Sequence, residues 1–116
     1  ESVKEACVRE FREETGIYVK NPKIKGIFTF IMKENDIVQS EWMMFTFVAD
    51  EYDGQHMEVS EEGLLEWMGI SELKDLPMAD GDYHILDYMI HGNGLIYGTF
   101  TYTPDFKLLS YRLDPN

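Results

Sequence analysis

Three glutamates near the start of the chain have a spacing suited to a chemical site. Glu10, Glu13 and Glu14 stand at positions i, i+3 and i+4, so they share one face of a helix. Residues 2–15 are helix formers without Pro or Gly, and Gly16 follows at the kind of position where helices commonly end. We therefore expect a helix over residues 2–15 that presents three carboxylates together.

An apolar stripe on the same helix gives this carboxylate face a direction. Val3, Cys7 and Phe11 form the stripe, which should face the core, and the glutamates overlap or border it. Carboxylates on an inward face repel one another and are costly to desolvate. A hard cation such as Mg²⁺, Mn²⁺ or Ca²⁺ would relieve that repulsion, while Arg9 orients one carboxylate. An ordinary amphipathic helix, with Glu chosen for helix propensity, is the alternative.

The residues around these glutamates resemble a known signature. Residues 9–17 read Arg-Glu-Phe-Arg-Glu-Glu-Thr-Gly-Ile, which closely resembles R-E-U-x-E-E-x-G-U, the core of the Nudix box, where U is a bulky apolar residue. Glu1 matches the upstream glutamate of the box, because seven residues separate it from Arg9. The opening Gly of the box and its spacer would precede Glu1. We therefore expect native sequence upstream, including sheet strands.

The resemblance implies a role for each matched residue. Glu10, Glu13 and Glu14 would bind the metal, which is Mg²⁺ or Mn²⁺ in such enzymes. Glu13 or Glu14 would also serve as the base or hold the attacking water, and Arg9 would orient a carboxylate. The family hydrolyses a nucleoside diphosphate linked to another group, and a metal that lowers the pKa of water suits that reaction.

A further metal ligand is implied downstream, where the chain resembles the MutT-like branch of the family. Glu62 lies five residues before Trp67, a spacing at which that branch places another metal-binding glutamate. Glu61 is the nearest competitor. The alternative is that both are solvated loop residues.

The same resemblance implies a pocket for the base of a nucleotide. Phe28 and Phe30 lie two residues apart on an expected strand, so they point to one face. Aromatic residues at such positions line the base pocket of the resembling enzymes, and plain core packing is the alternative. Asp80 and Asp82 resemble carboxylates that read a purine edge, although Gly81 separates them and no Trp adjoins them. The alternative for Asp82 is a helix N-cap.

The remaining sequence predicts interspersed helices and strands. Strands are expected at 23–32, 41–49 and 64–69, a brief helix capped by Ser71 before Pro77, a helix at 82–91, and a hairpin formed by 95–102 and 107–113. This order favours an α/β (α+β) layered domain over a parallel doubly wound sheet. The resemblance implies a Nudix fold, a mixed sheet sandwiched between helices, with residues 1–116 forming a single domain that lacks its N-terminal part.

Composition limits the partners. The 116 residues carry 22 Asp and Glu against 10 Lys and Arg, a formal charge of −12, which argues against nucleic acid and anionic membranes as partners. The single Cys7 excludes an internal disulfide and suits a reducing compartment, so we expect a cytoplasmic protein; a homodimer is compatible with the sequence. A small-molecule nucleotide is the expected partner.

The leading hypothesis is Mg²⁺-dependent pyrophosphohydrolysis of a nucleoside triphosphate, with an oxidised purine as the first guess. The alternatives are a Nudix hydrolase for a dinucleotide or nucleotide sugar, and a Nudix-like module that binds a nucleotide without cleaving it. The full set of glutamates argues against the non-catalytic module. An acidic scaffold protein is the third class, and it predicts no stabilisation by metal.

Overall fold

The structure is a computed structural model that describes residues 1–57, 59–60, 63–64 and 70–115. Its contacts divide the chain into two compact units. The first unit comprises Glu1–Lys23 and Phe47–Asp75, and the second comprises Ile24–Thr46 and Leu76–Asn116.

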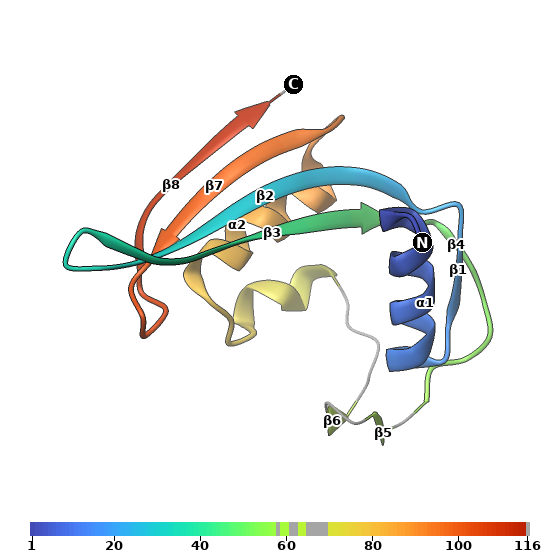
Figure 1. The fold of residues 1–116 in the computed structure, drawn as a ribbon. Coiled ribbons are helices and arrows are strands. Elements are labelled where there is room, and N and C mark those ends of the chain that lie inside the picture. Colours follow the sequence, from blue (N-terminus) through green and yellow to red (C-terminus); the bar gives the residue numbers. More distant parts are fainter. Residues whose placement is uncertain (58, 61–62, 65–69, 116) are drawn as a thin grey trace. The chain divides into compact units, whose positions relative to one another are not determined.

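The first unit contains one long helix and short paired strands (Figure 1). Its elements are α1 (Val3–Thr15), β1 (Tyr18–Lys20), β4 (Glu51–Asp53), β5 (Val59–Ser60), β6 (Gly63–Leu64) and the 3-10 helix η1 (Ile70–Asp75). Strand β1 pairs antiparallel with β4, and β5 pairs antiparallel with β6. An ion pair of 3.0 Å between Lys20 Nζ and Asp53 Oδ2 joins β1 to β4.

Local signals fix both ends of α1. Ser2 is the N-cap: its hydroxyl accepts from the backbone N–H of Glu5, whose carboxylate accepts from the N–H of Ser2. Gly16 ends the helix in the left-handed conformation, with a φ of 82°, and donates its N–H to the carbonyl of Arg12. A Cβ at Gly16 would also lie 3.3 Å from the carbonyl oxygen of Gln55. The expected helix and its glycine end are therefore confirmed.

The second unit is a mixed sheet with a helix (Figure 1). Its elements are β2 (Lys23–Glu34), β3 (Ile37–Val48), α2 (Asp80–His91), β7 (Ile96–Tyr102) and β8 (Leu108–Pro115). The strand order is β3-β2-β7-β8, in which β2 and β7 run parallel and β7 and β8 run antiparallel. Asn35 and Asp36 connect β2 to β3 with positive φ values of 52° and 64°, as a tight two-residue hairpin requires.

Alternate residues of β2 and β7 build the core against α2. The buried cluster consists of Phe28, Phe30, Ile85, Ile96, Phe100 and Tyr102. A Cβ on Gly98 would lie 2.7 Å from a ring carbon of Phe28, so the glycine gives the Phe28 ring its place on the sheet. This buried cluster packs one face of the sheet against α2.

The expected fold class is confirmed, and several boundaries are corrected. Strand β3 starts earlier than expected, and α2 begins at Asp80 rather than Asp82. Ser71 lies inside η1 instead of capping it, because the 3-10 helix starts at Ile70. Most of the strand expected over residues 64–69 lies outside the described residues.

Candidate active site

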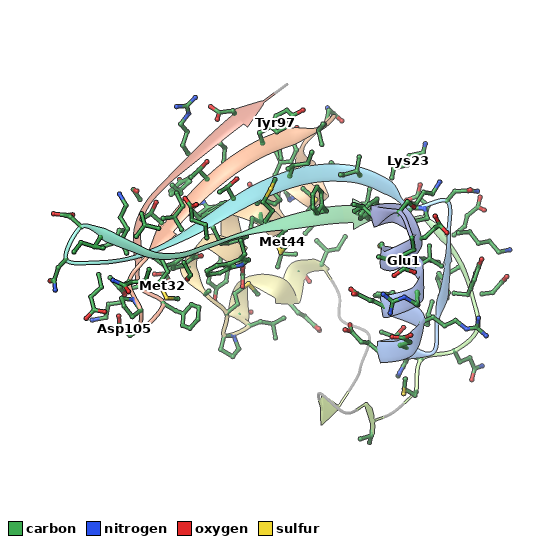
Figure 2. All side chains as sticks on the ribbon, in the orientation of Figure 1. Glu1, Lys23, Met32, Met44, Tyr97 and Asp105 are labelled. Carbon is green, nitrogen blue, oxygen red and sulfur yellow. The ribbon has the colours of Figure 1, made fainter. Side chains whose placement is uncertain are left out.

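The guanidinium of Arg9 gathers carboxylates along α1. Its Nε lies 2.9 and 3.0 Å from the two carboxylate oxygens of Glu1, and its Nη2 lies 2.6 Å from Glu1 Oε1. Its Nη1 donates to Glu13 Oε2 at 3.1 Å, and Nη2 lies 3.7 Å from Glu10 Oε1. Figure 2 labels Glu1 at the start of this helix. The expectation that Arg9 orients one carboxylate is therefore too narrow, because it contacts three.

These contacts shift the protonation of both partners. The hydrogen bonds from Arg9 hold the pKa of Glu1 below its usual range, against a small opposing effect of burial. The hydrogen bonds to Glu1, and then those to Glu13, raise the pKa of Arg9. Both groups therefore remain charged at neutral pH, and the guanidinium stays in place among the carboxylates.

The carboxylates are exposed, which corrects the expectation that they face inward. The side chains of Glu10 and Glu13 are each 62% exposed, and Glu14 is also exposed. The apolar stripe does not face a filled core either, since Val3 and Phe11 are 46% and 39% exposed. The helical spacing predicted which of these side chains share a face. It did not predict which residues pack against that face.

The apolar side of α1 borders a hollow within the first unit. The hollow measures about 260 Å³ and is lined by residues that include Cys7, Phe11, Ile17, Val19 and Tyr52. Burial, and then the negative charge of Glu10, raise the pKa of the Cys7 thiol. Cys7 is therefore a thiol that packs rather than a reactive thiolate at neutral pH.

The residues of α1 fit a divalent cation in donor chemistry. Glu1, Glu10 and Glu13 already surround one cationic group, the Arg9 guanidinium, and carboxylate oxygens are the ligands that Mg²⁺ prefers. Within the described residues, no three His, Cys, Asp or Glu side chains converge as a ready-made metal site. The glutamates of this helix would hold such an ion only with their exposed side chains turned to converge on it. Glu62 and its competitor Glu61 lie outside the described residues.

Asp80 and Asp82 lie in the first turn of α2, in the second unit. The N-cap is Ala79 rather than Asp82, so the N-cap interpretation of Asp82 is wrong. The Asp82 carboxylate instead accepts a hydrogen bond from the Ala79 backbone, and burial raises its pKa above the ordinary value despite that bond. Asp82 is therefore a half-buried carboxyl at a helix start, where its side chain also meets the positive end of the helix.

A tyrosine from β7 holds this turn, and no pattern in the sequence predicted the contact. The backbone N–H of Gly81 donates to the Tyr102 hydroxyl at 3.0 Å, in a buried contact between residues 21 positions apart. A Cβ at Gly81 would lie 2.1 Å from that hydroxyl, which explains the glycine between the two aspartates. Burial is the main cause of the raised pKa of Tyr102. Tyr102 thus positions the first turn of α2.

Phe28 and Phe30 are core residues. The Phe28 ring is fully buried and Phe30 is 6% exposed, so core packing, the alternative for both residues, describes their position. Trp42 of β3, which is 40% exposed, stacks on Phe30 with a centroid distance of 5.5 Å and an interplanar angle of 10°. Trp42 was not predicted as a site residue, because it lies in the continuous apolar run Trp42-Met43-Met44-Phe45, which has no alternation that would mark one face.

The mixed α+β fold and the glutamate-bearing helix define the class of protein. The NUDIX domain family matches residues 1–89, most of the chain, and this chain belongs to that family. It is a Nudix hydrolase, an enzyme that acts on phosphoric anhydride bonds, and enzymes of this family generally use a divalent metal.

Two relatives place the chain within the family. It is 63% identical over 115 residues to the uncharacterized Nudix hydrolase YvcI of Bacillus subtilis (strain 168), covering 99% of this chain and 73% of that protein. It is 52% identical to the MutT mutator protein of Bacillus halodurans, whose crystal structure matches with a TM-score of 0.96 over 100% of this chain and 76% of that one. These similarities support the MutT-like branch. No helix in the described part of the chain is long and apolar enough to cross a membrane.

Proposed function

We propose that this protein is a Mg²⁺-dependent pyrophosphohydrolase that converts a nucleoside triphosphate into the monophosphate and pyrophosphate. The observation that carries the proposal is the arrangement at α1, where Arg9 holds Glu13 and the preceding Glu1 beside Glu10 in a NUDIX domain. Such a set of oxygen ligands suits the charge of a polyphosphate only when a cation lies between them.

The proposal gives each carboxylate and Arg9 a separate role. Glu10, Glu13 and Glu14 would hold the cation, with Glu62 as a further ligand. When bound, the cation supplies neutralisation of the phosphate charge and makes water more acidic. Glu13 or Glu14 takes a proton from the attacking water, whose oxygen bonds to phosphorus as the anhydride P–O bond breaks and pyrophosphate leaves. Arg9 keeps Glu13 in position through its hydrogen bonds.

The substrate class is proposed from the start of α2. An oxidised purine triphosphate is our first choice because Asp80 and Asp82 stand at the start of α2, where carboxyl groups can bond to a purine edge. The resemblance to the MutT-like branch, together with the MutT name of the B. halodurans relative, supports a nucleotide. A dinucleotide or a nucleotide sugar is the alternative within the family.

The proposed compartment and binding partner are inferred from composition. A small-molecule nucleotide is the proposed partner, since a charge of −12 disfavours nucleic acid. We propose that the activity is cytoplasmic, because a chain with the single cysteine Cys7 suits a reducing compartment.

A nucleotide screen with Mg²⁺ tests the activity. Guanine, oxidised guanine, adenine and pyrimidine triphosphates, a dinucleotide and a nucleotide sugar are each incubated with the protein, and pyrophosphate is measured against orthophosphate. The proposal expects pyrophosphate from a triphosphate and fastest release from an oxidised purine. Fastest cleavage of the dinucleotide or nucleotide sugar would overturn the triphosphate assignment.

Metal binding has a readout besides activity. Millimolar Mg²⁺ or Mn²⁺ should raise the melting temperature of the wild type, because a ligand that binds only the folded state stabilises it. The increase should be much smaller in the double variant Glu13→Gln/Glu14→Gln. Equal shifts in the two proteins would remove these glutamates from the metal site, and no shift in either would favour the acidic scaffold.

A further inference from the structure

Asn93 and Gly94 form an asparagine–glycine pair in the connection from α2 to β7 (Figure 1). Asn21 precedes a proline and Asn35 precedes an aspartate, whereas Asn93 precedes a glycine. An asparagine side chain brings its amide carbon close to the backbone nitrogen of the next residue. Glycine lets that nitrogen reach the carbon, because it has no side chain to block the approach. The pair therefore has the composition that an attack of the Gly94 nitrogen on the Asn93 amide requires.

The structure leaves the Gly94 nitrogen available for this attack. Both residues of the pair are exposed, and in the described part of the chain the N–H of Gly94 donates no hydrogen bond. A Cβ built at Gly94 would meet no described atom within 4 Å, so no neighbouring group crowds the peptide. Gly94 also has a φ of 78°, a left-handed conformation that favours glycine. The turn therefore keeps a glycine at the position where the nitrogen must approach.

The pair Asp80-Gly81 shows how the fold can prevent the corresponding reaction. The N–H of Gly81 donates to the Tyr102 hydroxyl at 3.0 Å in a buried contact inside the first turn of α2. A nitrogen held in this way cannot turn toward the side chain before it. A carboxylate is also a weaker electrophile than an amide. Asn93 and Gly94 therefore differ from this pair in both the side chain and the hydrogen bonding of the nitrogen.

We propose that Asn93 is a site of spontaneous deamidation. The Gly94 nitrogen bonds to Asn93 Cγ and loses its proton, while the bond from Cγ to the side-chain nitrogen breaks and ammonia leaves. Water then opens the resulting succinimide ring at either of its two carbonyls. One opening gives aspartate at position 93, and the other gives isoaspartate, in which the chain continues through Cγ. This modification is independent of the proposed function.

The products alter the connection that follows α2. The Tyr88 hydroxyl donates to the main-chain carbonyl oxygens of Asn93 at 2.5 Å and Gly94 at 3.2 Å, and Tyr88 packs against the buried cluster. In the isoaspartate product, the main-chain carbonyl of position 93 becomes part of a free carboxylate. In the aspartate product, a negative charge lies two residues after His91, beside the negative end of the helix dipole. We therefore expect the aspartate form to be less stable than the original protein.

Peptide mapping by mass spectrometry tests the modification. The full-length protein is kept folded at mildly alkaline pH and body temperature, and samples taken over several weeks are digested with trypsin. Asn93 is the only amide side chain in the sequence between Lys74 and Lys107, so a gain of one mass unit in this peptide reports on Asn93. We expect the gain to increase with time, and fragmentation should locate both aspartate and isoaspartate at position 93.

Asn93→Gln is the matched control for the mapping. It keeps the amide but would have to form a larger ring, which closes far more slowly, so its peptide should gain little mass over the same period. A wild-type peptide that gains no mass over time would overturn the proposal. An equal gain in the control would also overturn it, because the reaction would then not depend on the asparagine.

Thermal unfolding tests the effect on α2. Asn93→Asp carries the charge of the aspartate product in every molecule, and it should have a lower melting temperature than the wild type. The uncharged Asn93→Gln should unfold close to the wild type. Added salt should reduce the difference between the two variants, because it screens an exposed charge. Equal melting temperatures of Asn93→Asp and Asn93→Gln would overturn the expected effect of the charge.

Discussion

At the scale of single residues, Arg9 organises the candidate site by geometry as well as by charge. Its guanidinium reaches Glu1 through two nitrogens and Glu13 through a third. A lysine ammonium is a point charge and cannot reproduce that planar fork. The position of Glu13 therefore depends on the shape of the Arg9 side chain.

Replacement of Arg9 by Lys should lower kcat/KM by about tenfold or more, because small misplacements of a catalytic group are costly. The measurement is steady-state hydrolysis of the preferred nucleotide. Arg12→Lys on the same helix is the matched control, since Arg12 lies over the Tyr18 ring at 5.9 Å and away from the carboxylate group. Equal activity of Arg9→Lys and wild type would show that only the charge of Arg9 matters.

Asp82 should make stability depend on pH in an unusual direction. Burial raises its folded-state pKa above the ordinary value of 3.8, so the folded protein binds this proton more tightly than the unfolded chain. The contribution of Asp82 to stability should therefore increase as the pH falls through the folded-state pKa and level off below about 3.8, the unfolded value. Near neutral pH this contribution is absent.

The pH effect can be isolated by comparison with Asp82→Asn, which does not titrate. Urea denaturation of both proteins between neutral pH and pH about 4 should show the wild type gaining stability relative to the variant as the pH falls. A stability difference that is constant with pH would show that Asp82 titrates alike in the folded and unfolded states.

Asp82→Asn should also weaken discrimination among bases more than Asp80→Asn does.

At the scale of elements, the first turn of α2 is held by a contact from β7. The Tyr102 hydroxyl satisfies the buried N–H of Gly81, one of the first-turn groups that the helix cannot pair itself. Sequence patterns predicted α1 well because its run of helix formers and its terminal glycine are local signals. They missed this contact because nothing local connects positions 81 and 102.

Tyr102→Phe should destabilise the protein by about 1–3 kcal/mol, the typical cost of leaving a buried N–H without a partner. Denaturant unfolding measures the change. Tyr97→Phe is the control, because Tyr97 lies on the same strand with its side chain exposed. If both variants lose the same stability, the hydroxyl of Tyr102 does not hold the turn.

At the scale of the whole molecule, the family signature predicted more of the structure than helical geometry did. The residues from Arg9 to Ile17 led to the Nudix family and the α+β fold, and the NUDIX match and the B. halodurans structure agree. The prediction that Glu10, Glu13 and Glu14 face inward is wrong, because the side-chain directions on one helix do not determine which residues cover that helix. Trp42 was missed for a related reason: its stack on Phe30 depends on strand register.

We propose that the glutamates of α1 perform metal-dependent cleavage of a phosphoric anhydride bond. The most direct test is the rate of pyrophosphate release from the preferred triphosphate with Mg²⁺, compared between wild type and Glu13→Gln/Glu14→Gln. The control is Glu34→Gln, which changes an exposed glutamate at the end of β2. We predict a loss of about 10²-fold or more in the double variant, the usual contribution of acid–base catalysis, and little change in the control. Equal rates in wild type and double variant would show that Glu13 and Glu14 do not act in the cleavage.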